Sequence, residues 1–196
     1  MKINFKLLLV TVLTACAMCA FTFYPFMCTD LHLKIYFTQD SAYTDCTLYY
    51  TTADAPNMSN SQKVDAILTE GKADLILPKE LCSKLTGLRL DFKHTDKLIC
   101  INRVELCSGG FVRKTYDASQ FFAEDNVVNT NQISALQNTT LVTYIGTNGN
   151  DPYLLLSPEM VHQFNLAFSH YTGSKAFLCI FIVVTIVLAR KKLYTL

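Results

Sequence analysis

Hydrophobic and polar residues alternate through the middle of the chain. Residues 31–37 (LHLKIYF) place an apolar side chain at every second position, and residues 88–93 (LRLDFK) repeat the pattern. A period of two predicts strands with one buried face. Together with stretches rich in β-branched and aromatic residues, it gives strands at 31–37, 46–52, 63–69, 73–77, 88–92, 98–106, 111–116, 141–145 and 153–156. Short strands at this spacing predict a mainly β protein, a β-sandwich of jelly-roll-like form.

Turn residues predict how two pairs of these strands connect. Glu70-Gly71 separates 63–69 from 73–77, and we expect these two stretches to pair. Asn148-Gly149 is a hairpin signal, and it lies between the strands predicted at 141–145 and 153–156.

Helical signals are confined to the second half of the central region. Residues 117–125 fit a short helix or a loop, and the Asn- and Thr-rich residues 126–140 fit a loop with at most one strand. Ser157 followed by Pro158 is typical of an N-cap and a first helical position. Apolar residues then recur at helical spacing, which predicts a helix over 158–171.

Apolar residues dominate both ends of the chain. Residues 176–189 (AFLCIFIVVTIVLA) are uncharged and are followed at once by Arg190, Lys191 and Lys192. Fourteen residues rise only about 21 Å as a helix, less than the roughly 30 Å of a hydrocarbon core. Uncharged flanking residues therefore extend the predicted transmembrane helix to 174–190. A buried core helix is the alternative, but a basic cluster is typical of a cytoplasmic membrane boundary.

The first apolar run, 7–27, follows Lys2 and Lys6 and carries no charge. It fits a signal peptide cleaved near Ala15-Cys16-Ala17, a bacterial lipoprotein signal ending at Cys16, or an uncleaved signal anchor. Either cleavage would leave a strongly apolar new N-terminus, so the run favours a signal anchor.

Charge supports a two-pass topology. All 16 acidic residues lie between Asp30 and Glu159, whereas basic residues flank the apolar runs. Because short basic flanks stay in the cytoplasm, we expect a cell-membrane protein with both termini inside and the central domain outside. The expected parts are a cytoplasmic 1–6, a signal anchor 7–27, an extracytoplasmic β-sandwich 28–157, a juxtamembrane helix 158–173, a transmembrane helix 174–190 and a cytoplasmic tail 191–196.

Residue types that carry catalysis form no motif in this chain. Gly-rich dinucleotide and Walker loops, the HExxH zinc motif and the GxSxG elbow are absent from the sequence. The four histidines are scattered, with no cysteine or carboxylate spacing typical of zinc or calcium. A net charge of +1 disfavours a nucleic-acid partner. We therefore expect no enzyme activity, no catalytic residue, no metal and no cofactor.

Four cysteines would face the outside: Cys46, Cys82, Cys100 and Cys107. An even four allows three disulfide pairings. Cys100 and Cys107 would join neighbouring strands if they paired, and free thiols fit the sequence equally well.

Four segments follow one another in an order that resembles a known bacterial module. They are Tyr36-Phe37 with Asp40 and Tyr43-Thr44, then 73–78 (ADLILP), then 85–91 (LTGLRLD), then 99–106. Over about 33–116 the chain resembles the extracytoplasmic β-sandwich module of Gram-positive membrane proteins of surface-polysaccharide assembly, which lies beside glycosyltransferase or multi-span regions. Phe92 stands where the module's Leu-Arg-Leu/Ile-Asp-Pro strand has proline. No glycosyltransferase region accompanies it here, so the resemblance implies no catalytic role.

Candidate binding residues are Tyr36, Asp40, Tyr43, Arg89 and Asp91. Arg89 and Asp91 share one strand face, where they would form either a fold-stabilising ion pair or the polar rim of a sugar site. Tyrosine rings stack on sugars, although tyrosines in strands more often pack half-buried. We expect a non-catalytic, membrane-anchored module that binds carbohydrate or a partner protein in cell-envelope polysaccharide assembly. The alternative is a structural or interaction subunit that joins an integral membrane complex through its transmembrane helices.

Overall fold

The computed structural model describes residues 29–38, 45–69, 71–93, 98–140 and 142–169. Residues Thr29–Ser169 form one compact unit. The predicted membrane runs 7–27 and 174–190 lie outside the described residues, and so do Asp40 and Tyr43. Within the described part of the chain, no helix is both long and apolar enough to span a bilayer.

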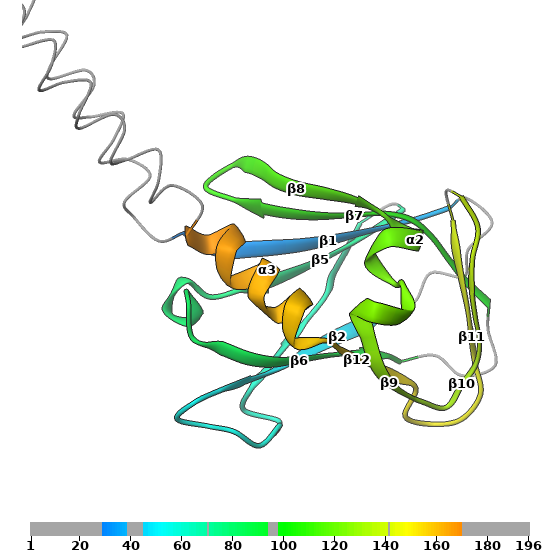
Figure 1. Cartoon of the computed structure of the whole chain (residues 1–196), viewed down its shortest axis with the longest axis horizontal. Helices are drawn as coiled ribbons and strands as arrows, with labels where there is room; N and C mark the ends of the chain where they lie inside the picture. The colour runs from blue at the N-terminus through cyan, green and yellow to red at the C-terminus, as the bar shows by residue number, and fades with distance from the viewer. Residues whose placement is uncertain (1–28, 39–44, 70, 94–97, 141, 170–196) are drawn as a thin grey trace, which may run out of the picture. The chain divides into compact units, whose positions relative to one another are not determined.

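Antiparallel strands make up most of this unit (Figure 1). The strands are β1 (Leu31–Phe37), β2 (Cys46–Thr52), β3 (Lys63–Asp65), β4 (Ile67–Thr69), β5 (Lys72–Leu77), β6 (Leu85–Phe92), β7 (Leu98–Ser108), β8 (Phe111–Asp117), β9 (Val127–Asn131), β10 (Ile133–Asn138), β11 (Thr143–Thr147) and β12 (Tyr153–Leu156). The helices are α2 (Ala118–Phe121), α3 (Pro158–Ser169) and the 3₁₀ turns η2 (Lys79–Leu81) and η3 (Glu124–Asn126).

The strands form a seven-stranded and a five-stranded sheet. The larger sheet has the order β10-β11-β7-β1-β5-β4, with β8 paired to β7, and the smaller has the order β3-β2-β6-β12-β9. β10, β11, β7 and β1 lie side by side in the larger sheet, and their neighbours along the chain, β9, β12, β6 and β2, lie in the same order in the smaller sheet. The edge strands β4 and β3 are also neighbours along the chain. The two sheets are therefore arranged like halves of one sheet folded over on itself. We call the line along which these pairs of strands pass from one half to the other the fold line. Figure 1 shows α3 between the two halves, on the side away from the fold line.

The predicted class, a mainly β protein with a two-sheet sandwich, is confirmed. β1 and β2 have the bounds that the sequence predicts, 31–37 and 46–52. In β1 every second residue is buried, from Leu31 to Phe37, because these side chains face the other sheet.

Residues 63–69 do not form the single predicted strand, because the fold line crosses them at Ala66. β3 pairs with β2 in the smaller sheet, whereas β4 pairs with β5 in the larger. The Ala66 N–H donates to the carbonyl of Cys46 at 2.9 Å, which holds the bend. The predicted pairing of 63–69 with 73–77 is confirmed only for 67–69, which form β4. Gly71, in the turn between β4 and β5, has the positive φ of 71° that suits a glycine.

The hairpin predicted around Asn148-Gly149 is wrong. β11 belongs to the larger sheet and β12 to the smaller, and each pairs with a strand from 127–138 instead. β9 and β10 also correct the prediction of at most one strand in 126–140. Residues 127–138 and 143–156 form one long hairpin, which bends where its two strands pass from the larger sheet to the smaller.

Gln132 holds this bend. Its backbone has a φ of 52°, and its carbonyl accepts from the Asn148 N–H at 3.0 Å. Its side-chain Oε1 accepts from the Asp151 N–H at 2.6 Å. The loop 148–152, whose sequence resembles a hairpin turn, therefore leads from β11 in the larger sheet to β12 in the smaller sheet.

Helix α3 begins where Ser157 and Pro158 predict. The Ser157 hydroxyl accepts from the Met160 N–H at 3.3 Å, which satisfies one of the free donors of the first turn. Farther along, the Asn165 side chain donates to the Leu85 carbonyl at 2.9 Å and accepts from the Leu85 N–H at 3.3 Å. This amide completes hydrogen bonds at the start of β6 and fixes the helix against the smaller sheet.

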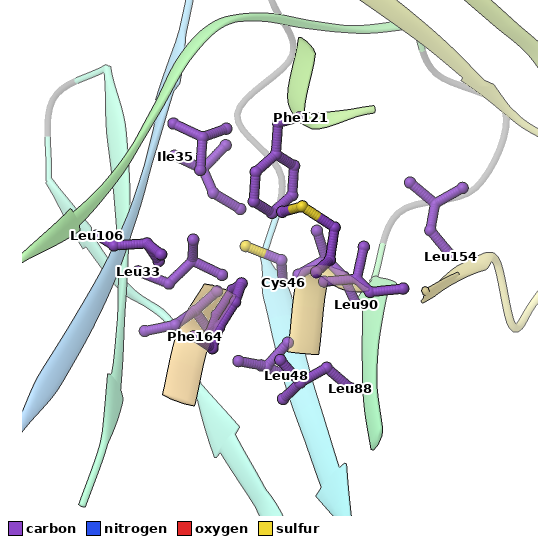
Figure 2. Packing of buried hydrophobic residues seen from close by; sticks show 14 of the residues in the cluster. Leu33, Ile35, Cys46, Leu48, Leu88, Leu90, Leu106, Phe121, Leu154 and Phe164 are labelled. Carbon is purple, nitrogen blue, oxygen red and sulfur yellow. The ribbon is translucent and has the colours of Figure 1, made fainter. Parts of the chain in front are cut away.

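The core lies between the folded halves (Figure 2). Leu33 and Leu106 come from the larger sheet, Leu48 and Leu90 from the smaller, and Phe164 of α3 lies between the two groups. The Phe164 ring is fully buried and lies 6.4 Å from the Phe121 ring of α2, measured between centroids. Helix α3 therefore fills the open side of the sandwich, and its Phe164 lies near Phe121 of α2.

Candidate functional site

A cluster of charged and aromatic side chains lies on the outer face of the smaller sheet. Arg89 and Asp91 alternate with buried leucines of β6, the central strand, so both face away from the core. Tyr49 of β2 lies directly opposite Arg89, and Tyr153 of β12 lies directly opposite Asp91. Tyr49, Arg89, Asp91 and Tyr153 together are called the Arg89 cluster.

Arg89 and Asp91 form a two-pronged ion pair. Arg89 Nε donates to one Asp91 oxygen at 2.8 Å, and a terminal guanidinium nitrogen donates to the other at 2.6 Å. The side chains are 23% and 12% exposed, so this pair is less accessible to water than an ordinary surface salt bridge. A guanidinium has five N–H groups, so those that do not face Asp91 remain able to bind another acceptor.

Two tyrosine rings enclose the Arg89 guanidinium. Its central carbon lies 4.6 Å from the centroid of Tyr49 and 4.5 Å from that of Tyr153. Both distances fall within the range of cation–π attraction. The planar group is therefore held by tyrosines of both neighbouring strands and by Asp91.

Burial raises the pKa of Asp91 above its ordinary value of 3.8. Hydrogen bonds and attraction from Arg89 lower that pKa and oppose the burial, while the nearby charge of Asp151 raises it further. Arg89 thus offsets part of the cost of burying the charged carboxylate.

The outer face of the larger sheet carries a similar arrangement. Arg103 of β7 lies opposite Tyr36 of β1, and its guanidinium carbon is 4.2 Å from the Tyr36 ring centroid. Arg103 Nε lies 3.2 Å from Glu105, whose other oxygen accepts from the Tyr36 hydroxyl at 2.8 Å. Burial, followed by this hydrogen bond to Glu105, raises the pKa of Tyr36. Arg103 is 48% exposed, so this second stack is more open to water than the first.

The structure separates the predicted binding residues. Arg89 and Asp91 are in direct contact, as one reading of the sequence expects. Tyr36 lies on the larger sheet, on the opposite outer face of the sandwich, and does not join them. Asp40 and Tyr43 lie outside the described residues.

Sequence reasoning missed Tyr153 as a member of this site. Tyr153 lies 64 positions after Arg89, in a strand that the sequence places in a hairpin with β11. Only the pairing of β12 with β6 brings its ring to the guanidinium. Tyr49 lies in a strand that the sequence predicts, but nothing in the sequence sets its register against Arg89.

A second group of charges borders the Arg89 cluster on the same sheet. Asp65 of β3 accepts from the Thr47 hydroxyl at 2.6 Å and lies 3.2 Å from the Lys93 ammonium. The hydrogen bond from Thr47, followed by that from Lys93, lowers the pKa of Asp65. The face thus presents fixed donors and acceptors along β3, β2, β6 and β12.

The cysteines show no disulfide among the residues that the structure describes. Cys100 and Cys107 lie on one strand, β7, so they do not join neighbouring strands. Cys46 is fully buried in the core, and burial, with a contribution from the Asp45 charge, raises its pKa to about 12. Its thiol is therefore an apolar packing group and no nucleophile at neutral pH.

Metal-binding chemistry is not assembled in the described residues, which contain no group of three or more His, Cys, Asp or Glu side chains placed to hold an ion. The Arg89 cluster instead groups guanidinium N–H donors, a carboxylate and tyrosine hydroxyls on one face of the smaller sheet. Such groups bind hydroxyl-rich or anionic ligands through hydrogen bonds. Comparisons of the chain with protein-family models, curated proteins and solved structures give no match in any of the three.

Proposed function

We propose that this chain is a non-catalytic, jelly-roll-like β-sandwich, held between two transmembrane helices, that binds carbohydrate outside the cell during envelope-polysaccharide assembly. The observation that carries the binding site is the Arg89 cluster. Its guanidinium is fixed by two rings and a carboxylate before any ligand arrives. Preorganised polar groups bind more tightly because less conformational freedom is lost on binding.

Three further features support this proposal. The apolar runs at 7–27 and 174–190 favour a membrane tether, and the segments over about 33–116 resemble a module of surface-polysaccharide assembly. The cluster lies on three neighbouring strands of one sheet, so its side chains are held side by side on a hydrogen-bonded backbone. A partner protein bound through the same face is the competing use of this surface.

Tyr153→Ala is expected to weaken carbohydrate binding by about three- to tenfold, the loss typical of one stacking contact. The substitution removes a ring that stacks on the Arg89 guanidinium, while Tyr49 and Asp91 still hold that group. The measurement is the affinity of the full chain, in lipid nanodiscs, for Gram-positive envelope polysaccharides on a glycan array and by calorimetry.

Tyr36→Ala is the matched control. It also removes a tyrosine stacked on the arginine of an arginine–carboxylate pair, but on the opposite sheet. We expect its binding to equal that of the unsubstituted chain. Equal loss in both variants, or loss in Tyr36→Ala alone, contradicts the assignment to the smaller sheet. A chain that binds none of the polysaccharides contradicts the proposed function and favours an interaction subunit.

A further inference from the structure

The turn between β7 and β8 exposes two adjacent apolar side chains. Gly109 and Gly110, with φ of 60° and 79°, form the turn. Phe111 and Val112 follow at 58% and 56% exposure, among the highest values for large apolar residues in the described chain. β8 pairs with β7 alone, so the tip projects from the edge of the larger sheet. We call residues 109–113 the β7–β8 tip.

This tip lies beside the point where the chain enters the sandwich. The Thr29 and Ser108 hydroxyls are 2.8 Å apart, and a Cβ added to Gly109 would lie 3.4 Å from the Thr29 hydroxyl oxygen. Thr29 comes two positions after the apolar run 7–27. The tip therefore lies beside Thr29, the first described residue after the first predicted membrane run.

The helix that precedes the second predicted membrane run also contacts β8. Lys114 of β8 donates to the Gln163 side chain of α3 at 2.8 Å. From Gln163 the helix continues to Ser169, a rise of about 9 Å, and the second predicted run begins at 174. Figure 1 places the β7–β8 turn and the last turn of α3 at the same end of the unit.

We propose that the β7–β8 tip inserts Phe111 and Val112 into the headgroup region of the membrane that holds the chain. This inference rests on the membrane tether of the proposed function. Aromatic side chains favour the interface between headgroups and acyl chains. The Arg113 guanidinium, whose central carbon lies 5.5 Å from the Phe111 ring centroid, adds a positive charge that suits an anionic lipid surface. The contact fixes which end of the sandwich faces the bilayer.

Tryptophan fluorescence tests this contact, because the chain contains no tryptophan. Phe111→Trp supplies a single reporter at the tip. Val128→Trp, at a site of similar exposure (54%) on β9, supplies the matched control. Both full-length variants are reconstituted into vesicles of phosphatidylglycerol and phosphatidylcholine, with and without brominated acyl chains.

We expect bromolipid to quench the emission of Phe111→Trp by half or more and its maximum to be blue-shifted, while Val128→Trp keeps the emission of a water-exposed indole. Equal emission and equal quenching in the two variants overturn the inference. Extraction at alkaline pH is measured on the same vesicles. A chain that stays in the bilayer but shows no quenching at position 111 contradicts the tip contact alone, whereas a chain that washes out contradicts the tether.

Discussion

Phe164→Ala is expected to lower the free energy of unfolding by about 3–5 kcal/mol, the largest effect of any single substitution considered. The Phe164 ring is fully buried between the folded halves of the sheet and packs near Phe121. Its removal leaves a cavity between α3 and the sheets that rigid strands close poorly. The measurement is urea unfolding of the full chain in detergent, followed by near-ultraviolet circular dichroism.

His162→Ala is the control for this prediction. His162 lies on the exposed side of the same helix, two positions before Phe164, so its truncation removes no core contact. We expect a change within about 0.5 kcal/mol. If Phe164→Ala is as mild as the control, α3 is not part of the core and the packing described for the open side of the sandwich is wrong.

Arg89→Ala is expected to destabilise the chain by about 3 kcal/mol at pH 7, toward the lower end of the range for a broken buried pair. The substitution leaves the Asp91 carboxylate, 12% exposed, without the guanidinium that faces it. It also empties the space between the Tyr49 and Tyr153 rings. Thermal and urea unfolding of Arg89→Ala and of the unsubstituted chain, both at pH 7, measure the difference in the free energy of unfolding.

The pH dependence of this loss follows from the raised pKa of Asp91. A carboxyl whose pKa is higher in the folded than in the unfolded state penalises folding when it is charged, and that penalty disappears as the pH falls below the unfolded value of 3.8. Without Arg89 the folded pKa rises further. The stability difference between the variant and the unsubstituted chain therefore shrinks as the pH falls from 7 through the raised pKa.

Two comparisons separate this explanation from a simple loss of packing. Arg89→Ala combined with Asp91→Asn removes the buried charge, and we expect it to recover part of the lost stability at pH 7. Arg103→Ala, at a guanidinium that is 48% exposed, is expected to cost less than about 1 kcal/mol. A loss that is independent of pH and is not reduced by Asp91→Asn would mean that the charge of Asp91 has no part in it.

The sequence predicts the strands far better than it predicts their partners. Alternation from Leu31 to Phe37 gives the bounds of β1, because one face of that strand is buried along its whole length. β9, with three exposed residues of five, lies at the edge of the smaller sheet and gives no such signal. A strand that buries little side-chain surface resembles a polar loop.

The fold line explains the two wrong connections. Residues 63–69 and the loop 148–152 each pass from one sheet to the other, yet locally they look like a strand and a hairpin turn. The positions of Ala66 and Gln132 at this line depend on contacts with distant segments, such as the bond from Ala66 to Cys46. Short-range patterns contain no information about these contacts.

The candidate site was predictable only within one strand. Arg89 and Asp91 share a face by period-two geometry, and their contact needs no tertiary knowledge. The two rings that enclose Arg89 come from strands 40 positions before it and 64 after it. Whether these rings reach Arg89 depends on the register of β2 and β12 against β6, which the tertiary fold determines.

Labelling with a membrane-impermeant thiol reagent tests the proposed outward-facing, tethered sandwich most directly. Asn60→Cys places a thiol in the exposed turn between β2 and β3, and Thr195→Cys places one in the predicted cytoplasmic tail 191–196. Both are compared with the unsubstituted chain in intact and in permeabilised cells. We predict that Asn60→Cys gains label in intact cells and that Thr195→Cys gains it only after permeabilisation. If Asn60→Cys gains label only after permeabilisation, the sandwich faces the cytoplasm and cannot bind envelope carbohydrate outside the cell.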